Sequence, residues 1–322
     1  MSKKVAVVLF NLGGPDKLTS VKEFLFNLFY DPAIIRLPNP FRWCIAKLIS
    51  SKRENTAKDI YKQIGGGSPI LAITQKQAEL IEKELNIQNN LKLEFKLFIS
   101  MRYWHPRAKE VIKKVEKFSP EKIVYFPLYP QYSTTTTKSS FEEFSKFLNK
   151  SNLKNIPLKI IYSYYQEPNF IKAHAELIYQ TIKDITGNFR ILFSAHGLPE
   201  YIVKNGDPYQ QQIEETVELV VKELAQIGLD YVICYQSKVG PLKWIGPSTE
   251  EELLKAARDK VSVAVVPIAF VSDHSETLVE LDIEYKELFE KNSKKSYLRV
   301  PALNENKNFI LSVAQTILEK SQ

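Results

Sequence analysis

The sequence predicts an α/β protein made of two doubly wound units that are related by an approximate repeat. Strand-like apolar runs alternate with amphipathic helical stretches along the 322 residues, the pattern of a mainly parallel sheet with helices on its faces. Helical periodicity is clear in four segments, 74–81, 108–118, 209–227 and 308–320. A chain of this length has enough material for one large or two mid-sized domains.

Three strand-like segments of the first half have counterparts in the second half, in the same order. The pairs are VAVVLFNLGGP (5–15) with RILFSAHGLP (190–199), KLEFKLFISMRY (92–103) with YVICYQSKVGP (231–241), and IVYFPLYPQYS (123–133) with VAVVPIAFVSD (263–273). The third pair shares a proline inside the run, Pro127 and Pro267. The second and third strands lie about thirty residues apart in both halves, a usual βαβ interval. Chance resemblance between apolar strands is the alternative to a repeat.

We expect the domain boundary in the polar link SNLKNIP, residues 151–157, which ends in a proline. The two domains are then 1–152 and 153–322, with their strand ends facing a shared cleft. The helix expected at 308–320 can pack on either domain.

The first half carries about 46 more residues between its first two strands than the second half does. This insertion, about 16–70, is rich in apolar side chains: Val21, Phe24, Leu25, Leu28, Phe29, Ile34, Ile35, Leu37, Phe41 and Trp43. It is either a helix packed on the core or an apolar lip over the cleft, and we favour the lip because such insertions often shape ligand entrances. The same lip is suited to contact with a membrane surface.

The amino-acid composition excludes several kinds of site and partner for this protein. The two cysteines, Cys44 and Cys234, form no CxxC motif, which excludes a cysteine-ligated zinc site and a four-thiolate iron–sulfur cluster; we expect both to be buried structural thiols. The formal charge of +7 is spread along helices without a nucleic-acid motif, so we expect no nucleic-acid partner. No apolar run reaches the roughly 18–20 residues of a membrane span, and the N-terminus lacks a signal-peptide pattern. We therefore expect a cytoplasmic protein.

His196 ends the apolar run of the segment RILFSAHGLPE and is followed directly by Gly197. Ligands of sheets wound with helices bind just beyond the carboxyl ends of strands, where this histidine is expected. A strand-end histidine that only satisfies nearby backbone groups is the simpler interpretation of this residue alone.

A second strand end runs into VSDHSETLVELDIEY, residues 271–285. Its acidic residues recur along one face of the expected helix: Asp273, Glu276, Glu280 and Glu284. Asp273 and Glu276 also fit a capping box, and an acidic row is often only a solvated face. Like charges repel along such a row, and a cation would remove that repulsion. Imidazole with carboxylate oxygen is a ligand set for a divalent first-row metal, so His196 and Glu276 are predicted to share a site.

Other strand ends supply polar and aromatic groups, in MRYWHP (101–106) and YPQYSTTTTKSS (129–140). The loop GGGSPI (65–70) lacks the ending of a P-loop, and neither GxGxxG after a strand nor GxSxG occurs. Aromatic walls with few nucleophiles suit a flat apolar ligand and a metal better than acyl or phosphoryl transfer.

These residues carry a resemblance to the ferrochelatase family. SAHGLP, GDPYQ, QSKVGPLKWIGP and PIAFVSDHSETLVELDIEY resemble family motifs, and NLGGP, IGGGSPI, MRYWHP and YPQYSTTTTKSS match further ones, so the resemblance covers nearly the whole chain. It implies two Rossmann-like, chelatase-like domains, each with a four-stranded parallel sheet, and a porphyrin held between them. It implies insertion of ferrous iron into protoporphyrin IX, a lyase reaction that gives protohaem in the last step of haem biosynthesis.

The resemblance also implies roles for particular residues. His196 matches the active-site histidine of the family and Glu276 its acidic partner, and we assign them jointly to proton removal and metal binding. Residues implied to hold the ring are Leu12, Phe24, Leu25, Leu28, Arg102, Tyr103, Tyr132, Ser133 and Trp244. Asp273, Glu280 and Glu284 resemble an acidic metal path, on a helix often widened to π form.

Two departures from the family's range of patterns are informative. Some members carry a [2Fe–2S] cluster on a cysteine-rich C-terminal extension, whereas 303–322 contains no cysteine; we predict no cluster and no cofactor beyond the substrate Fe²⁺. Asn11 and Leu12 in the first loop resemble protoporphyrin-using members more than the coproporphyrin-using branch. Family members include monomers and dimers, and we expect a monomer.

Two other functions fit parts of the pattern. A tetrapyrrole or metal carrier that binds without turnover would also use the apolar lip and the acidic row. A chelatase for cobalt or nickel would use the same kind of donor atoms.

Overall fold

The computed structural model describes residues 2–88, 93–225 and 228–321. They form two compact units: the first runs to Ser163 and takes in the chain again from Val313, and the second is Tyr164–Ser312. The predicted boundary after Asn152 falls inside the first unit of this division, and the limits of the folding domains stay a prediction.

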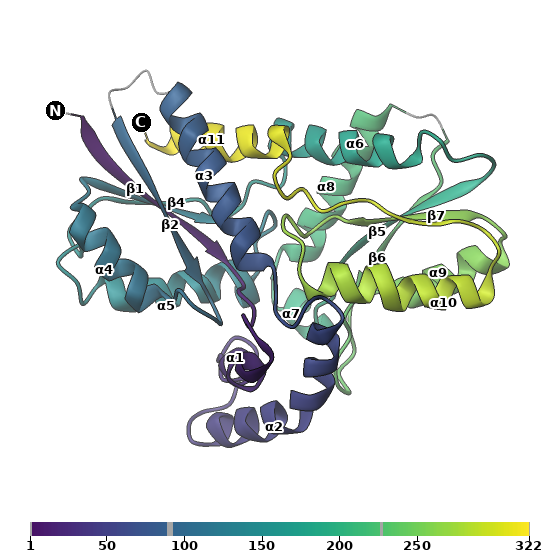
Figure 1. Ribbon diagram of the computed structural model, residues 1–322, viewed down its shortest axis with the longest axis horizontal. Coiled ribbons are helices and arrows are strands. Elements are labelled where there is room, and N and C mark those ends of the chain that lie inside the picture. Colours follow the sequence, from purple (N-terminus) through teal and green to yellow (C-terminus); the bar gives the residue numbers. More distant parts are fainter. Residues whose placement is uncertain (1, 89–92, 226–227, 322) are drawn as a thin grey trace. The chain divides into compact units, whose positions relative to one another are not determined.

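The first unit is a four-stranded parallel sheet with helices (Figure 1). Its strands are β1 (Lys3–Asn11), β2 (Leu93–Met101), β3 (Lys122–Pro127) and β4 (Leu158–Ile160). Its helices are η1 (Leu18–Ser20), α1 (Val21–Phe29), α2 (Phe41–Lys62), α3 (Ile70–Gln88), α4 (Ala108–Phe118), η2 (Thr134–Lys138) and α5 (Ser139–Leu148). The order across the sheet is β2-β1-β3-β4, so β2 is an edge strand.

The second unit repeats this plan. Its strands are β5 (Phe189–His196), β6 (Tyr231–Gln236), β7 (Ser262–Pro267) and β8 (Tyr297–Arg299). Its helices are α6 (Pro168–Ile182), α7 (Glu200–Lys204), α8 (Tyr209–Leu224), α9 (Thr249–Arg258), η3 (Glu276–Tyr285) and α10 (Lys286–Asn292), and α11 (Lys307–Ser321) leads out of it. The parallel order β6-β5-β7-β8 matches that of the first sheet element for element.

This correspondence confirms the predicted fold class. The segments paired in the sequence become β1 with β5, β2 with β6 and β3 with β7. Each central strand is apolar and almost wholly buried because helices cover both faces of the sheet. The predicted helices are found at α3, α4, α8 and α11, although residues 226–227 of the predicted 209–227 segment lie outside the described residues.

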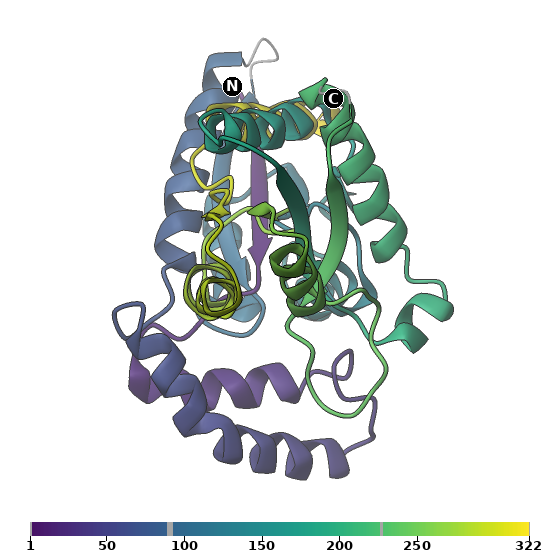
Figure 2. The ribbon, with the colours of Figure 1, turned by 90° about the vertical axis from the view of Figure 1, so that its right-hand side faces the viewer.

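The insertion forms α1 and α2, which lie side by side in both views (Figures 1 and 2). One face of this pair is a core, in which Val21, Phe24 and Leu25 pack with Tyr61 and Trp104. The other face is exposed, and its largest apolar residues are Leu37, Phe41, Trp43 and Leu48. The insertion is therefore a packed pair of helices that also presents apolar side chains to solvent, and a lip over the cleft stays a prediction.

Cys44 was predicted to be buried, and that is wrong. Cys44 is exposed on α2, whereas Cys234 is buried on β6. Of its apolar neighbours in the sequence, Trp43 is exposed and Ala46 is buried. Consecutive residues of a helix point to different faces, so an apolar neighbourhood did not mean burial here. Among the described residues, no helix is long and apolar enough to cross a membrane.

Candidate active site

His196 and Glu276 meet at the carboxyl edge of the second sheet. His196 is the last residue of β5, and Glu276 is the first residue of η3, which follows β7. The Nδ1 atom of His196 lies 2.9 Å from Oε2 of Glu276, and both side chains are partly exposed. Two residues 80 positions apart in the chain are thus joined because parallel strands end at the same edge of a sheet.

Gly197 lets the chain turn tightly after His196. A Cβ atom at this position would lie 3.1 Å from the carbonyl oxygen of Gln236 and 3.1 Å from Cε3 of Trp244. The Trp244 ring stands edge-on to the His196 ring, with 6.3 Å between the ring centroids. The glycine therefore allows the indole and the neighbouring strand to close in beside the histidine.

The two side chains shift each other's pKa in opposite directions. Burial lowers the pKa of His196, but attraction to the Glu276 carboxylate and the hydrogen bond between them outweigh burial and raise it above its usual value. Burial raises the pKa of Glu276, but the charge and hydrogen bond of His196 dominate and lower it well below its usual value. The arrangement favours an imidazolium–carboxylate pair up to a higher pH than a free histidine would allow, and the pair releases a proton when the pH rises further.

Glu280 lies one turn further along η3, which is a π-helix. Its carboxylate accepts hydrogen bonds from the backbone N–H of Ser237 (2.8 Å), from Tyr285 Oη (2.9 Å) and from Gln236 Nε2 (3.0 Å). The Ser237 hydroxyl also donates to Glu280 and lies 3.5 Å from Oε2 of Glu276. Residues from the end of β6 therefore fix the two carboxylates next to each other.

The position of Ser237 has a conformational cost. Its φ is +63°, in the left-handed region that residues other than glycine seldom adopt. Burial and the charge of Glu276 raise the pKa of Glu280, and the three hydrogen-bond donors oppose that rise. The strained serine thus helps to keep Glu280 ionised beside a second carboxylate.

Asp273 takes part in a different set of contacts. Arg299 of β8 donates to Asp273 (3.0 Å) and, through two nitrogens, to Asp282 of η3 (2.7 and 2.8 Å). Asn304 also donates to Asp273, at 2.6 Å. No capping bond from Asp273 begins η3, whose cap residue is Ser275. Asp273 therefore holds the loop before η3 to β8, while Glu284 of the predicted row is exposed.

His274 is a neighbour of the pair whose position the pattern did not explain. It is buried, its Nδ1 lies 3.0 Å from the carbonyl oxygen of Ser272, and its Nε2 lies 4.0 Å from Oε2 of Glu276. Two imidazoles therefore lie within 4.0 Å of the same carboxylate oxygen of Glu276.

In the first unit, Arg102 and Tyr103 belong to a buried polar cluster. Arg102 donates to Asp31 (2.8 Å) and to Ser139 (2.8 Å), and Tyr103 donates to the same oxygen of Asp31 (2.8 Å). Glu143 lies 3.2 Å from Arg102. The polar atoms of these two predicted ring-binding residues are thus hydrogen-bonded to Asp31, in the loop after α1. These bonds anchor the inserted helices to the end of β2.

The other predicted ring-binding residues of this unit differ in exposure. Phe24 and Leu25 are buried, at 5% and 7%, whereas Leu12 and Leu28 are partly exposed. Ser133 is buried and caps η2 by accepting from the backbone N–H of Thr135, at 3.1 Å. Tyr132 packs edge-on against Tyr162, with ring centroids 6.1 Å apart.

The described residues contain no group of three or more His, Cys, Asp or Glu side chains placed to hold a metal ion.

Several residues of the site were missed by sequence reasoning. Gln236 and Ser237 stand at the end of β6, and Asp31 lies in a loop. The sequence could have indicated Gln236 and Ser237, because they are polar residues directly after an apolar strand. No pattern in the sequence indicated Asp31, because its partners Arg102 and Ser139 are distant in sequence.

Known proteins resemble this chain in sequence over almost its whole length. A family model described as Ferrochelatase matches residues 4–321. The chain is 51% identical over 319 residues to the ferrochelatase of Pelagibacter ubique, covering 99% of this chain and 92% of that protein. It is 54% identical over 313 residues to the ferrochelatase of a Wolbachia of Drosophila simulans, covering 97% of this chain and 98% of that protein.

Solved structures resemble the fold at low sequence identity. SirB from Bacillus subtilis with Fe³⁺ aligns with a TM-score of 0.57 at 10% identity, covering 99% of this chain and 95% of that one. The sirohydrochlorin chelatase SirB from the spizizenii subspecies, in complex with cobalt, gives a TM-score of 0.55 at 12% identity and the same coverage. At such identities the likeness concerns the fold alone.

Proposed function

The chain belongs to the ferrochelatase family, and from this premise we propose that it inserts ferrous iron into protoporphyrin IX to give protohaem, in the last step of haem biosynthesis. The reaction forms nitrogen–metal bonds and is that of a lyase. The observation that carries the proposal is the contact of His196 with Glu276 at a strand end, in a chain that matches the family model over residues 4–321.

The proton balance of the reaction explains the need for such a pair. Two pyrrole N–H protons leave the ring as Fe²⁺ binds its four nitrogens, so an acceptor must stand near the ring. Neutral His196 accepts one of these protons, and Glu276 stabilises the imidazolium that forms. Because the His196 side chain is partly exposed, it can release this proton to solvent and then accept the second one. Glu280, held by Ser237, Gln236 and Tyr285, places a second carboxylate one turn further along η3.

Iron is a substrate of the proposed reaction. The same imidazole and carboxylate atoms are ligands suited to Fe²⁺, and we assign His196 and Glu276 jointly to metal transfer and proton removal. Glu280 and the exposed Glu284 continue an acidic path along η3. Asp273 supports that path by holding the loop before η3, because its carboxylate is bound to Arg299 and Asn304.

We assign ring binding to apolar and aromatic side chains. Trp244 is beside His196, and Leu12, Leu28 and Tyr132 are the partly exposed members of the first unit. The predicted residues Phe24, Leu25, Arg102, Tyr103 and Ser133 are mostly buried or hydrogen-bonded within the unit. In this proposal they shape and support the surface that the ring contacts.

The remaining assignments concern partners. We propose no iron–sulfur cluster, because the chain has only two cysteines, of which Cys234 is buried. We propose a cytoplasmic monomer without a nucleic-acid partner. The exposed apolar residues Phe41, Trp43 and Leu48 of α2 support peripheral contact with the inner face of a membrane.

An anaerobic insertion assay tests the function. Fe²⁺ and protoporphyrin are mixed with the protein, and the change in porphyrin absorbance gives the rate. We expect His196→Ala to lower the rate to that without protein while porphyrin still binds, and His105→Ala, a change at an exposed histidine, to keep it. Wild-type turnover in His196→Ala would remove the central assignment, and porphyrin binding without insertion by the wild-type protein would indicate a carrier.

The same assay separates the two roles of the pair. If His196 first receives the iron, a conservative change such as His196→Gln raises the KM for Fe²⁺ more than it lowers kcat. If it takes the pyrrole proton, the loss is in kcat. Rates with Co²⁺ and Ni²⁺ measured in parallel give the metal preference.

A further inference from the structure

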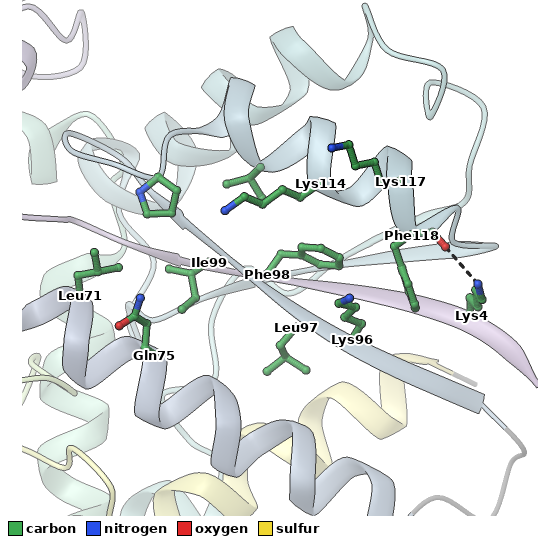
Figure 3. A pocket seen from close by; sticks show the side chains of 12 residues that line it. Lys4, Leu71, Gln75, Lys96, Leu97, Phe98, Ile99, Lys114, Lys117 and Phe118 are labelled. Atoms are coloured by element: carbon green, nitrogen blue, oxygen red, sulfur yellow. Dashed lines mark hydrogen bonds between the residues drawn. The ribbon is translucent and has the colours of Figure 1, made fainter.

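A groove of about 560 Å³ runs along the edge strand β2 of the first unit (Figure 3). Helix α3 borders it on one side and α4 on the other, and the start of β1 closes one end. It is lined by Lys4, Leu71, Gln75, Lys96, Leu97, Phe98, Ile99, Pro106, Val111, Lys114, Lys117 and Phe118. All of these residues belong to the first unit, and none of them has a role in the proposed function.

The floor of the groove is apolar and partly aromatic. Phe98 of β2 and Phe118 of α4 have ring centroids 5.9 Å apart and pack in one cluster with Val111. Leu97 and Ile99 line the groove from the opposite face of β2, towards α3. Figure 3 shows the Phe98 and Phe118 rings next to each other below α4. The volume is within the range of about 300–1,000 Å³ typical of sites for small molecules.

Four ammonium groups surround this floor. Lys4 and Lys96 lie 5.2 and 5.6 Å from the centroid of the Phe118 ring, and Lys114 and Lys117 are exposed on α4. Within residues 2–88, 93–225 and 228–321, no salt bridge pairs any of the four with a carboxylate. The Lys4 ammonium donates only to the carbonyl oxygen of Phe118, at 3.5 Å, among the contacts described for it. Four positive charges gathered over an apolar surface without ion-pair partners repel one another, and a bound dianion would relieve that repulsion.

The backbone of β2 argues against the addition of a further strand. Glu82 of α3 accepts from the outward-facing N–H of Leu97 at 2.7 Å, and Pro106 accepts from that of Met101 at 2.8 Å. A partner strand would have to displace both contacts. Glu82 and Glu79 also line the neighbouring hollow on the α3 side, so an anion is favoured only towards α4 and β1.

We propose that this groove binds a flat aromatic molecule that carries two carboxylates. The Phe98 and Phe118 rings contact the aromatic body, and Lys96 and Lys4 at one end and Lys114 and Lys117 on α4 receive the carboxylates. Phosphate and other small anions lack the apolar body that the floor requires, and a neutral aromatic molecule lacks the charge that the lysines require.

Calorimetric titration with naphthalene-2,6-dicarboxylate tests the proposal. We expect saturable binding of one molecule per chain, weaker binding of 2-naphthoate and none of the neutral naphthalene-2,6-dimethanol. The double variant Lys96→Glu/Lys114→Glu should weaken binding of the dicarboxylate by at least about tenfold, because each ion pair lost and each repulsion gained adds to the effect. The control Lys109→Glu/Lys113→Glu makes the same charge change at exposed positions of α4 outside the groove.

The control variant should bind like the wild-type protein. Equal losses in the two double variants would mean that overall charge governs binding, and wild-type affinity in the groove variant would place the ligand elsewhere; either result overturns the proposal. So would a change of oligomeric state in the groove variant alone, since a second copy would then occupy the groove. Both double variants should keep the rate of iron insertion, so that a failure here is distinct from a failure of the proposed function.

Discussion

The contact of His196 with Glu276 makes the protonation of the site depend on two residues at once. The pKa of His196 is raised and that of Glu276 is lowered. The stability that His196 contributes is therefore present below its unfolded pKa of about 6.5 and is lost as the pH rises through its folded value. The contribution of Glu276 is present above about 4.5 and is lost as the pH falls through its folded value. The ion pair consequently stabilises the fold most between these limits.

Replacing Glu276 by Gln should move the activity profile. His196 must be neutral to accept a proton, so the acidic limb of kcat/KM follows its raised pKa. Without the carboxylate, burial dominates and the pKa of His196 falls. We expect the limb to shift to lower pH in Glu276→Gln and to stay in place in Glu284→Gln, a change at an exposed position of the same helix. If activity is too low, NMR titration of the His196 ring measures the same shift, and an unmoved pKa contradicts the coupling.

Ser237 allows the hydroxyl and the backbone at one position to be tested separately. Ser237→Ala and Ser237→Gly both remove the hydroxyl that donates to Glu280, and both keep the backbone N–H. The loss of a hydrogen bond to a charged group, worth about 1.5–3 kcal/mol, should raise the pKa of Glu280 and lower the insertion rate by a similar factor in both.

Stability should distinguish the two variants. At a φ of +63° the alanine carries a Cβ strain that glycine avoids, so we expect Ser237→Ala to unfold about 1 kcal/mol more easily than Ser237→Gly in urea. Equal stability would show that the left-handed conformation costs nothing here.

At the scale of elements, η3 links the chemistry to the sheet. Its first residue is Glu276, its fifth is Glu280, and its Asp282 is fixed to Arg299 of β8. Glu276 contacts His196 at the end of β5, and Glu280 contacts the end of β6. Asp282, which is not one of the predicted acids, contacts β8. Helical spacing predicted that Glu276 and Glu280 share a helix, but it could not assign the partners of the acids on this helix, because these come from three other strands.

Helix α6 contains a buried histidine, from which we expect the fold to become less stable at acidic pH. His174 is 1% exposed, packs edge-on against Phe170, and burial lowers its pKa to about 3. Below about pH 6.5 the unfolded chain binds a proton at this histidine, whereas the folded chain does so only near pH 3. The free energy of unfolding therefore falls by about 1.4 kcal/mol for each unit by which the pH is lowered from about 6.5 towards about 3.

Urea unfolding between pH 4 and pH 7 measures this slope. His174→Phe should reduce it by the contribution of one proton, and Gln180→Phe, at an exposed position of the same helix, should leave it unchanged. An unaltered slope in His174→Phe would mean that the imidazole is already protonated in the folded protein.

At the scale of the whole molecule, the first unit is discontinuous in sequence. The chain returns to it from Val313, in the middle of α11, and Ser321 accepts a hydrogen bond from Lys122 of β3 at 2.7 Å. Val313 and Ile317 are fully buried. The last helix therefore packs as part of the first unit.

Ile317→Ala tests this packing. Removal of a buried isoleucine side chain should cost about 2–5 kcal/mol of unfolding free energy, and Glu319→Ala, two residues away and exposed, should cost little. We expect hydrogen exchange to become faster at the amides of β3, more than a hundred residues away in sequence. Loss of protection confined to α11 would contradict the coupling.

The sequence by itself determined the order of strands and helices, the repeat and the residues that stand at strand ends, because burial and backbone hydrogen bonding impose periodic patterns that are local in the chain. It therefore placed His196 and Glu276 at the same edge of one sheet. Only the tertiary structure decided which acids face them, that Ser237 holds Glu280, that Arg102 binds Asp31, and that α11 completes the first unit. These are contacts between segments distant in sequence, and their geometry depends on how strands and helices pack rather than on any spacing along the chain.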